Sequence, residues 1–161
     1  MSWRVEHRRG GVDELHHLEV DGTTRSVLIL EVTRPALALG STQSMDMVAP
    51  GVSEARDVPR RHSGGGLVLL DPDDVAWVDV VIPAGDPLWR VDVGEAFVWL
   101  GRAWAEAVTP HLSAVDAPPI VHRGGPVHAD LGRAVCFAGV GSGEVVVGDR
   151  KLVGMSQRRT R

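Results

Sequence analysis

The sequence has little of several residue types and patterns. It contains one cysteine, Cys136, and one lysine, Lys151, among 161 residues. A single cysteine excludes a framework of internal disulfide bonds. No apolar run approaches the ~20 residues that a membrane helix requires, and the N-terminus lacks the apolar core of a signal peptide. We therefore expect a cytoplasmic protein that has no membrane partner.

An excess of positive charge is also missing. Lys and Arg number 17 against 21 Asp and Glu, which gives a formal net charge of −4. This balance disfavours nucleic acid as a partner, although arginines cluster at Arg158, Arg159 and Arg161. The seven histidines include no pair four residues apart beside a glutamate. The sequence therefore predicts no metal site and disfavours a metal hydrolase.

The length and the 43% hydrophobic content are enough for one globular domain with a real core. Apolar residues three and four apart after Asp92 predict a helix that ends near Pro110, lies across the sheet and buries Trp99 and Trp104 in the core. Apolar runs bounded by turn residues predict short strands. Strands are expected at 27–32, 36–39, 58–61, 67–70, 76–82 and 120–121, a hairpin at 144–147 and 151–156, and a short helix at 52–56.

The most informative segment is Arg60-Arg61-His62-Ser63-Gly64-Gly65-Gly66, which lies between two predicted strands. Three consecutive glycines allow positive φ and bring backbone N–H groups close to a ligand, and two guanidinium groups supply charge for a phosphate or carboxylate. This chemistry suits an acyl phosphate or a nucleotide. The same residues also fit a glycine-rich hairpin connection whose arginines are solvated.

The predicted hairpin carries the single lysine directly after its turn, Gly148-Asp149. A hairpin holds one side chain in a fixed direction, and a lysine ammonium can reach a carboxylate or a phosphoryl oxygen. An exposed turn lysine is the alternative. Cys136 lies fifteen positions before Lys151 between apolar residues, a context that is also typical of an inert core cysteine.

Two motifs in this order resemble the lipoate-protein ligase and octanoyltransferase family, whose fold is shared with biotin ligases. Residues 60–68 are similar to the family's arginine-arginine-any-serine-glycine-glycine-glycine loop, which holds the acyl adenylate. Residues 148–159, GDRKLVGMSQRR, are similar to the hairpin that carries the catalytic lysine. Residues 35–43, PALALGSTQ, resemble the strand and turn before the loop. The resemblance covers most of the chain.

The resemblance implies an α+β fold, biotin/lipoate ligase-like, over residues 1–161: a mixed, largely antiparallel β-sheet with helices packed on it and an apolar tunnel for the acyl chain. It implies an enzyme that activates lipoate or octanoate with ATP and Mg²⁺. The acyl group then passes to a lysine of a lipoyl domain, either of a 2-oxo acid dehydrogenase acyltransferase or of the glycine-cleavage H protein. Lys151 would stabilise the charge that develops at the reacting centre. The expected binding residues are Arg60, Arg61, Ser63, Gly64, Gly65, Gly66, Asp71 and Gly154.

Other mechanisms remain open at this point. Some octanoyltransferases of the family carry a cysteine ahead of the same hairpin, so Cys136 could take an octanoyl group from acyl carrier protein as a thioester, without ATP. A binding module that holds an acyl or nucleotide ligand without turnover is a third possibility. Biotin ligation is disfavoured, because the loop lacks the alternating glycine-arginine pattern of that branch.

The sequence departs from the family pattern in two places. After the glycine loop the family often shows a histidine-aspartate pair and then a glycine-asparagine pair, and only Asp71 of this chain matches. The chain also stops at Arg161, where family members continue with further sheet and helix. We therefore expect the C-terminal part of the family domain to be missing, which leaves the edge of the last strand exposed.

Overall fold

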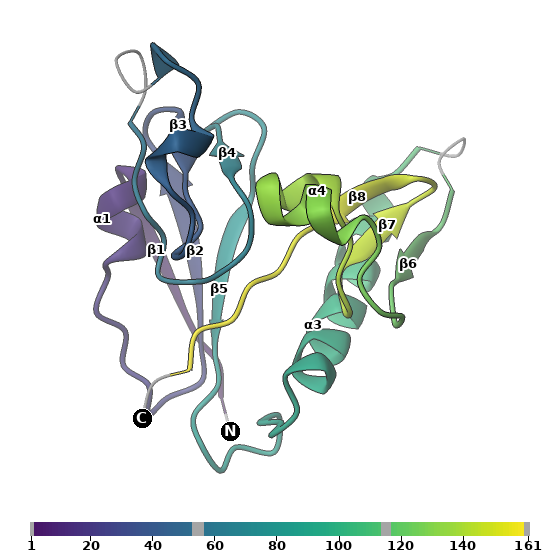
Figure 1. Ribbon diagram of the computed structural model, residues 1–161. Helices are drawn as coiled ribbons and strands as arrows, with labels where there is room; N and C mark the ends of the chain where they lie inside the picture. Colours follow the sequence, from purple (N-terminus) through teal and green to yellow (C-terminus); the bar gives the residue numbers. More distant parts are fainter. Residues whose placement is uncertain (1, 53–56, 114–116, 160–161) are drawn as a thin grey trace. The chain divides into compact units, whose positions relative to one another are not determined.

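The computed structural model describes residues 2–52, 57–113 and 117–159 and has an α+β fold (Figure 1). The chain divides into two compact units, Met1–Trp89 and Arg90–Arg161. Apart from Val52, the short helix expected at 52–56 lies outside the described residues. None of the helices in the described part of the chain is long and apolar enough to cross a membrane.

The first unit is organised around a three-stranded sheet in the order β1-β2-β5. Its strands are β1 (Arg4–Gly10), β2 (Ser26–Val32) and β5 (Trp77–Val81). β1 runs parallel to β2, and β5 runs antiparallel to it with Leu30 opposite Trp77. The sheet is therefore mixed, and the expected strands at 27–32 and 76–82 are confirmed.

Helix α1 (Val12–His16) and the central strand build the core of this unit. Burial alternates along β2, as expected for a strand with one face on the core. α1 contacts β1 and β2, beside which it lies in Figure 1. The buried core consists of Val12, Leu15, Leu28, Leu30, Val32, Ala36, Ala38 and Leu70. Because Val12 and Leu15 anchor α1 in this core, the position of the neighbouring His16 is fixed as well.

A second, two-stranded sheet supports the glycine loop. β3 (Ala36–Ala38) pairs antiparallel with β4 (Val68–Leu70), which confirms the strands expected at 36–39 and 67–70. The strand expected at 58–61 is wrong as a regular strand, because only isolated parallel bridges link Asp57 to Ala36 and Arg60 to Leu39. Pro59 has no N–H to donate to a continuous ladder, although its carbonyl accepts from the Leu39 N–H. The 3₁₀-helix η1 (Met45–Met47) follows β3.

The second unit begins with the long helix α3 (Val93–Val108), followed by the 3₁₀-helix η2 (Thr109–His111). The Asp92 side chain caps α3 by accepting from the Glu95 N–H at 2.8 Å. The expected helix after Asp92 is confirmed, and it ends at Val108, directly before the 3₁₀ segment that contains Pro110. Trp99 and Trp104 are half-buried, so their predicted place in a core holds only in part.

α3 packs on an antiparallel sheet in the order β6-β7-β8. The strands are β6 (Pro119–Val121), β7 (Val145–Val147) and β8 (Arg150–Val153). The small strand at 120–121 and the hairpin are confirmed, but the second strand of the hairpin ends at Val153 and does not continue to Ser156. A Cβ on Gly101 of α3 would lie 2.0 Å from the Gly143 carbonyl oxygen, which shows how closely helix and hairpin approach. The short helices α4 (Ala129–Ala134) and η3 (Cys136–Ala138) connect β6 to β7.

Candidate functional site

The β7–β8 hairpin positions Lys151 in the second unit. Gly148, with φ of 61°, makes the tight turn, which favours glycine because a Cβ is strained at positive φ. The register shifts between Val145 and Val146, opposite Val153 and Lys151. An irregularity of this kind re-aims the side chains of a strand. The Lys151 side chain is only 3% exposed, so the alternative of an exposed turn lysine is wrong.

Three acceptors surround the Lys151 ammonium group. Its Nζ lies 2.7 Å from Oε2 of Glu144 and donates to the carbonyl oxygens of Cys136 at 2.8 Å and Gly139 at 3.1 Å. The nitrogen also lies 5.2 Å from the centre of the Phe137 ring. A lysine ammonium has three N–H donors, and these acceptors match that number. The ammonium can therefore donate to a ligand only after it gives up one of these partners.

Glu144 is the carboxylate partner of this group, and its side chain is 8% exposed. Its Oε2 also accepts from the Gly141 N–H at 2.7 Å, and its Oε1 accepts from the Met155 N–H at 3.0 Å. Glu144 thus joins the turn before β7 to the segment after β8 and to the ammonium. The sequence analysis placed Glu144 at the start of the hairpin and gave it no role in the site.

Cys136 and Gly154 both lie beside the Lys151 side chain. Cys136 is half-buried and is the first residue of η3, and its carbonyl oxygen is one of the acceptors of the ammonium. A Cβ on Gly154 would lie 3.0 Å from Cε of Lys151 and 3.3 Å from the Phe137 ring. Three of the expected site residues, Lys151, Cys136 and Gly154, therefore converge in the second unit.

The glycine loop forms a separate group in the first unit. Gly65 has φ of 100°, and its carbonyl oxygen lies 1.9 Å from the position of a Cβ on Gly40. Only a glycine at position 40 permits this approach. The loop is further joined to the turn after β3, because the Ser41 N–H donates to the Ser63 carbonyl at 3.0 Å. Gly64 is exposed with open space around it.

Arg61 is buried inside this loop, with 7% of its surface exposed. Its Nη2 donates to the Gly66 carbonyl oxygen at 2.7 Å, and its backbone N–H donates to the Leu39 carbonyl at 2.9 Å. Its Nε is buried without a hydrogen-bond partner. The structure records no ion pair of Arg61 with any described carboxylate. The alternative of two solvated arginines is therefore wrong for Arg61.

The side chains of Arg60 and Asp71 each stabilise a backbone turn. The exposed Arg60 donates to the Gly40 carbonyl at 3.1 Å and to the Gln43 carbonyl, so it braces the turn after β3. Asp71 follows β4, and its Oδ1 accepts from the Asp73 N–H at 3.1 Å. Both side chains stabilise the backbone in this structure, and a ligand would have to share or replace these bonds.

The sequence analysis gave no role to His16, which lies at the end of α1. Its ring packs against Trp77 of β5, with ring centres 4.4 Å apart. Burial, and next the Arg61 guanidinium, lower the pKa of His16 to about 4. The neighbouring His17 makes an edge contact with His62 of the loop at 4.4 Å between ring centres. The histidines at the end of α1 thus belong to the surroundings of the glycine loop.

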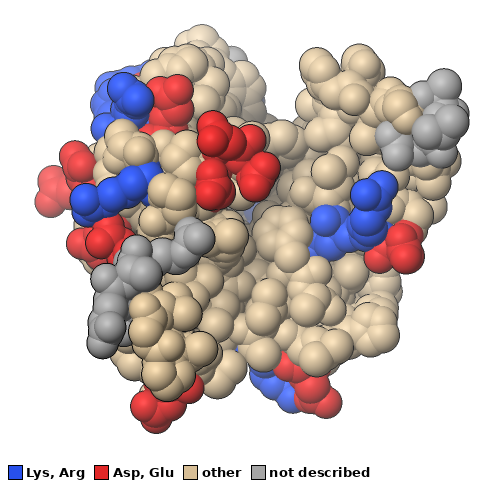
Figure 2. Space-filling view, turned by 90° about the horizontal axis from the view of Figure 1, so that it is seen from above, with Lys and Arg blue, Asp and Glu red and all other residues tan. Residues whose placement is uncertain are grey.

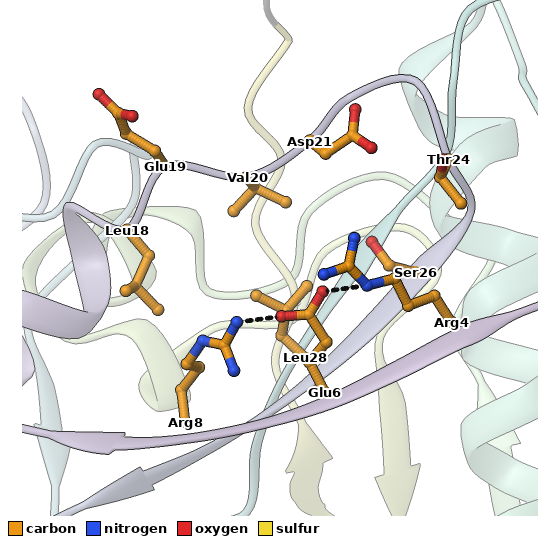
Figure 3. Close-up of a pocket in the computed structure, with 10 residues that line it drawn as sticks. All are labelled: Arg4, Glu6, Arg8, Leu18, Glu19, Val20, Asp21, Thr24, Ser26 and Leu28. Atoms are coloured by element: carbon orange, nitrogen blue, oxygen red, sulfur yellow. Dashed lines mark hydrogen bonds and ion pairs between the residues drawn. The ribbon is translucent and has the colours of Figure 1, made fainter.

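A separate small pocket lies between the sheet and the segment Leu18–Thr24 (Figure 3). Its volume is about 170 Å³, which is below the range of ligand pockets for drug-sized molecules. Figure 3 shows Glu6 between Arg4 and Arg8, each paired with the same carboxylate. Each guanidinium in this pocket is therefore already engaged with the Glu6 carboxylate.

Acidic and basic side chains are interspersed in small groups on the face drawn in Figure 2. Within the described ranges, no group of three or more His, Cys, Asp or Glu side chains could hold a metal ion.

Comparison with protein-family models, with curated proteins and with solved structures found no match to this chain.

Proposed function

We propose that the protein is a lipoate-protein ligase-like enzyme with a biotin/lipoate ligase-like fold. One observation carries the proposal: each of the two motif segments is built around a buried cation, Arg61 in the glycine loop and Lys151 on the hairpin. Lysine and arginine are almost never fully buried unless they are paired. Lys151 is paired with Glu144, whereas Arg61 has no ion pair with a described carboxylate. Both cations occur in segments that resemble the adenylate loop and the lysine hairpin of one family.

The proposed reaction has two steps. The carboxylate of lipoate or octanoate attacks the α-phosphorus of ATP, and pyrophosphate leaves, which gives an acyl adenylate. The ε-amine of a lysine on a lipoyl domain then attacks the acyl carbonyl, and AMP leaves with the bonding electrons while the amine loses its proton. Mg²⁺ accompanies the phosphates of ATP. The acceptor belongs to a 2-oxo acid dehydrogenase acyltransferase or to the glycine-cleavage H protein.

The residues of the chain take distinct roles in this reaction. Lys151 donates to the acyl carbonyl and the phosphate, where negative charge develops. Gly64, Gly65 and Gly66 give clearance and N–H groups to the adenylate, and Arg61 supplies charge. Since the ammonium of Lys151 already contacts three acceptors, the acyl carbonyl and the phosphate replace the two backbone carbonyl contacts while Glu144 keeps the ammonium in place.

One contact supports an octanoyltransferase mechanism as the second candidate. Cys136 is half-buried and its own carbonyl oxygen binds the Lys151 ammonium, so thiol and cation belong to one group. In an octanoyltransferase this thiolate would attack the thioester of octanoyl acyl carrier protein, release the carrier thiol, and pass the octanoyl group to the target lysine without ATP.

Acyl transfer to a purified apo lipoyl domain, followed by intact mass, tests both mechanisms. One mixture contains octanoate or lipoate with ATP and Mg²⁺, and the other contains octanoyl acyl carrier protein. The ligase proposal expects modification only in the first mixture, retained in Cys136→Ser and lost in Lys151→Met. Arg150→Gln, an exposed neighbour on β8, is the matched control. Modification only in the second mixture, lost in Cys136→Ser, assigns the transferase, and no modification in either mixture points to a binding module.

A further inference from the structure

Two buried nitrogen atoms without hydrogen-bond partners belong to the neighbourhood of the glycine loop: Nε of Arg61 and Nε2 of His16. Only one other buried side-chain atom in the described part of the chain, Oε1 of Gln157, shares this condition. Buried polar atoms are nearly always paired, and an unpaired one destabilises the fold. Two such atoms in one neighbourhood point to an acceptor that both can bind.

Both side chains are held in place by other parts of the fold. His16 follows the anchored residues of α1 and packs against Trp77. Arg61 is tied to β3 through its backbone and to Gly66 through Nη2. Neither group can therefore turn to a new partner without disturbing the core or the loop. An external acceptor is the simpler way to satisfy them.

The charged groups around His16 indicate the charge that the acceptor carries. Arg61 and His62 approach from the loop, and His17 follows α1; each lowers the pKa of His16. Asp13 of α1 acts in the opposite direction and raises the pKa of His16. Trp77 of β5 contributes an uncharged ring. Asp13 is also engaged with His17, whose Nδ1 lies 3.5 Å from its Oδ1. The balance at the two unpaired nitrogens is positive, which favours an anion.

We propose that His16 and Arg61 form one oxyanion-binding site, and that binding of a phosphate- or sulfate-type anion is coupled to uptake of a proton by His16. An oxyanion with several oxygens accepts from the guanidinium and from the imidazole at the same time. Its negative charge favours the protonated imidazole, which then donates through Nε2. This proposal deepens the proposed function and rests on it, because the anion is the phosphate of the acyl adenylate.

Sulfate is the suitable probe, because it keeps its double negative charge between about pH 5 and pH 8 and does not titrate together with histidine. The histidine Cε1–H resonances of the full chain are followed against pH, with and without sulfate, at constant ionic strength. The His16 resonance is identified by its loss in His16→Gln. The other six histidines serve as internal references.

The site predicts that saturating sulfate raises the pKa of His16 well above its value of about 4 in the free chain. By linkage, sulfate then binds about tenfold more tightly at pH 5 than at pH 8. Calorimetry in two buffers of different ionisation enthalpy should show proton uptake near pH 5. His16→Gln removes this pH dependence, His17→Gln keeps it, and Arg61→Gln abolishes sulfate binding.

A His16 resonance that does not move in saturating sulfate overturns the proposal, and so does an absence of sulfate binding to the folded wild-type chain. If Arg61→Gln fails to fold, His16→Gln and the wild-type titration still decide. Proton-linked sulfate binding without acyl transfer would keep the anion site and refute the ligase assignment. Acyl transfer without a sulfate-dependent change in the pKa of His16 would keep the ligase assignment and refute the anion site.

Discussion

The buried pair of Lys151 and Glu144 gives the sharpest prediction about this molecule. Their side chains are 3% and 8% exposed with 2.7 Å between Nζ and Oε2. Lys151→Met removes the cation and leaves the Glu144 carboxylate buried with two backbone N–H groups, those of Gly141 and Met155. Breaking such a pair costs about 3–5 kcal/mol, because an uncompensated charge remains buried.

A double-mutant cycle separates the pair from the rest of the cluster. Glu144→Gln keeps an oxygen acceptor but removes the charge, and the combined Lys151→Met and Glu144→Gln variant buries no net charge. The double variant should be more stable than the sum of the single costs predicts, with a coupling of about 2 kcal/mol. The matched control is the pair of Arg9 and Glu31, which is 3.7 Å apart with side chains 73% and 74% exposed. Arg9→Met should cost at most about 1 kcal/mol.

Urea unfolding, monitored through hydrogen exchange of the β7–β8 amides, measures these costs locally. A local measurement is needed because the two units need not unfold together. With a slope of about 1–3 kcal/mol per molar urea, the loss at Lys151→Met shifts the midpoint by about 1 M or more. If Lys151→Met costs no more than Arg9→Met, the ammonium is not held by Glu144 and the site as described is wrong.

Three further predictions concern other parts of the structure. Burial and the Arg61 charge lower the pKa of His16 to about 4, so the unfolded chain binds more protons between about pH 6.5 and pH 4. The free energy of unfolding should therefore fall by roughly 1–2 kcal/mol as the pH falls through this window, and His16→Gln should flatten that part of the profile measured by urea titration. Gly40→Ala should displace the glycine loop, since the new Cβ would lie 1.9 Å from the Gly65 carbonyl oxygen; a melting temperature within about 1 °C of wild type and an unchanged amide spectrum of residues 60–66 would contradict this. Gly154→Ala should press on Cε of Lys151, 3.0 Å from the added carbon. It should lower acyl-transfer activity while the melting temperature stays close to that of the wild type, and a loss of activity that accompanies a clear fall in melting temperature would indicate a purely structural effect.

Local patterns predicted the elements that carry their own signals. β2 alternates between buried and less buried residues, and α3 has both an apolar spacing and the Asp92 cap. The hairpin was evident from Gly148-Asp149 between apolar strands. In each case the residues that form the element also contain the reason for it, so the sequence alone was sufficient.

β1 and α4 were not predicted, and the reason differs between them. β1 is charged and mostly exposed, with the sequence RVEHRRG, and it is a strand because it pairs in parallel with β2. α4 has only six residues and starts after His128, which has φ of 51°. Long-range pairing and a left-handed entry residue leave no periodic signal in a single sequence.

The sequence named candidate site residues but did not predict the contacts that the structure shows among them. Motif order brought Lys151, Cys136 and Gly154 forward, and the structure brings Lys151 of β8 and Gly154, directly after it, together with Cys136 of η3. The role of Glu144 was missed, because a glutamate at a strand end is ordinarily solvated. His16 was missed for a related reason: its proximity to Arg61 depends on how α1 packs, and no spacing along the chain encodes that.

The most direct test of the ligase assignment is exchange of labelled pyrophosphate into ATP, dependent on octanoate or lipoate. This measurement reports the adenylation step alone and needs no acceptor protein, so the choice of lipoyl domain cannot confuse it. We predict exchange that requires the fatty acid and Mg²⁺, persists in Cys136→Ser and is lost in Lys151→Met. Folded wild-type protein that shows no acid-dependent exchange would contradict the account.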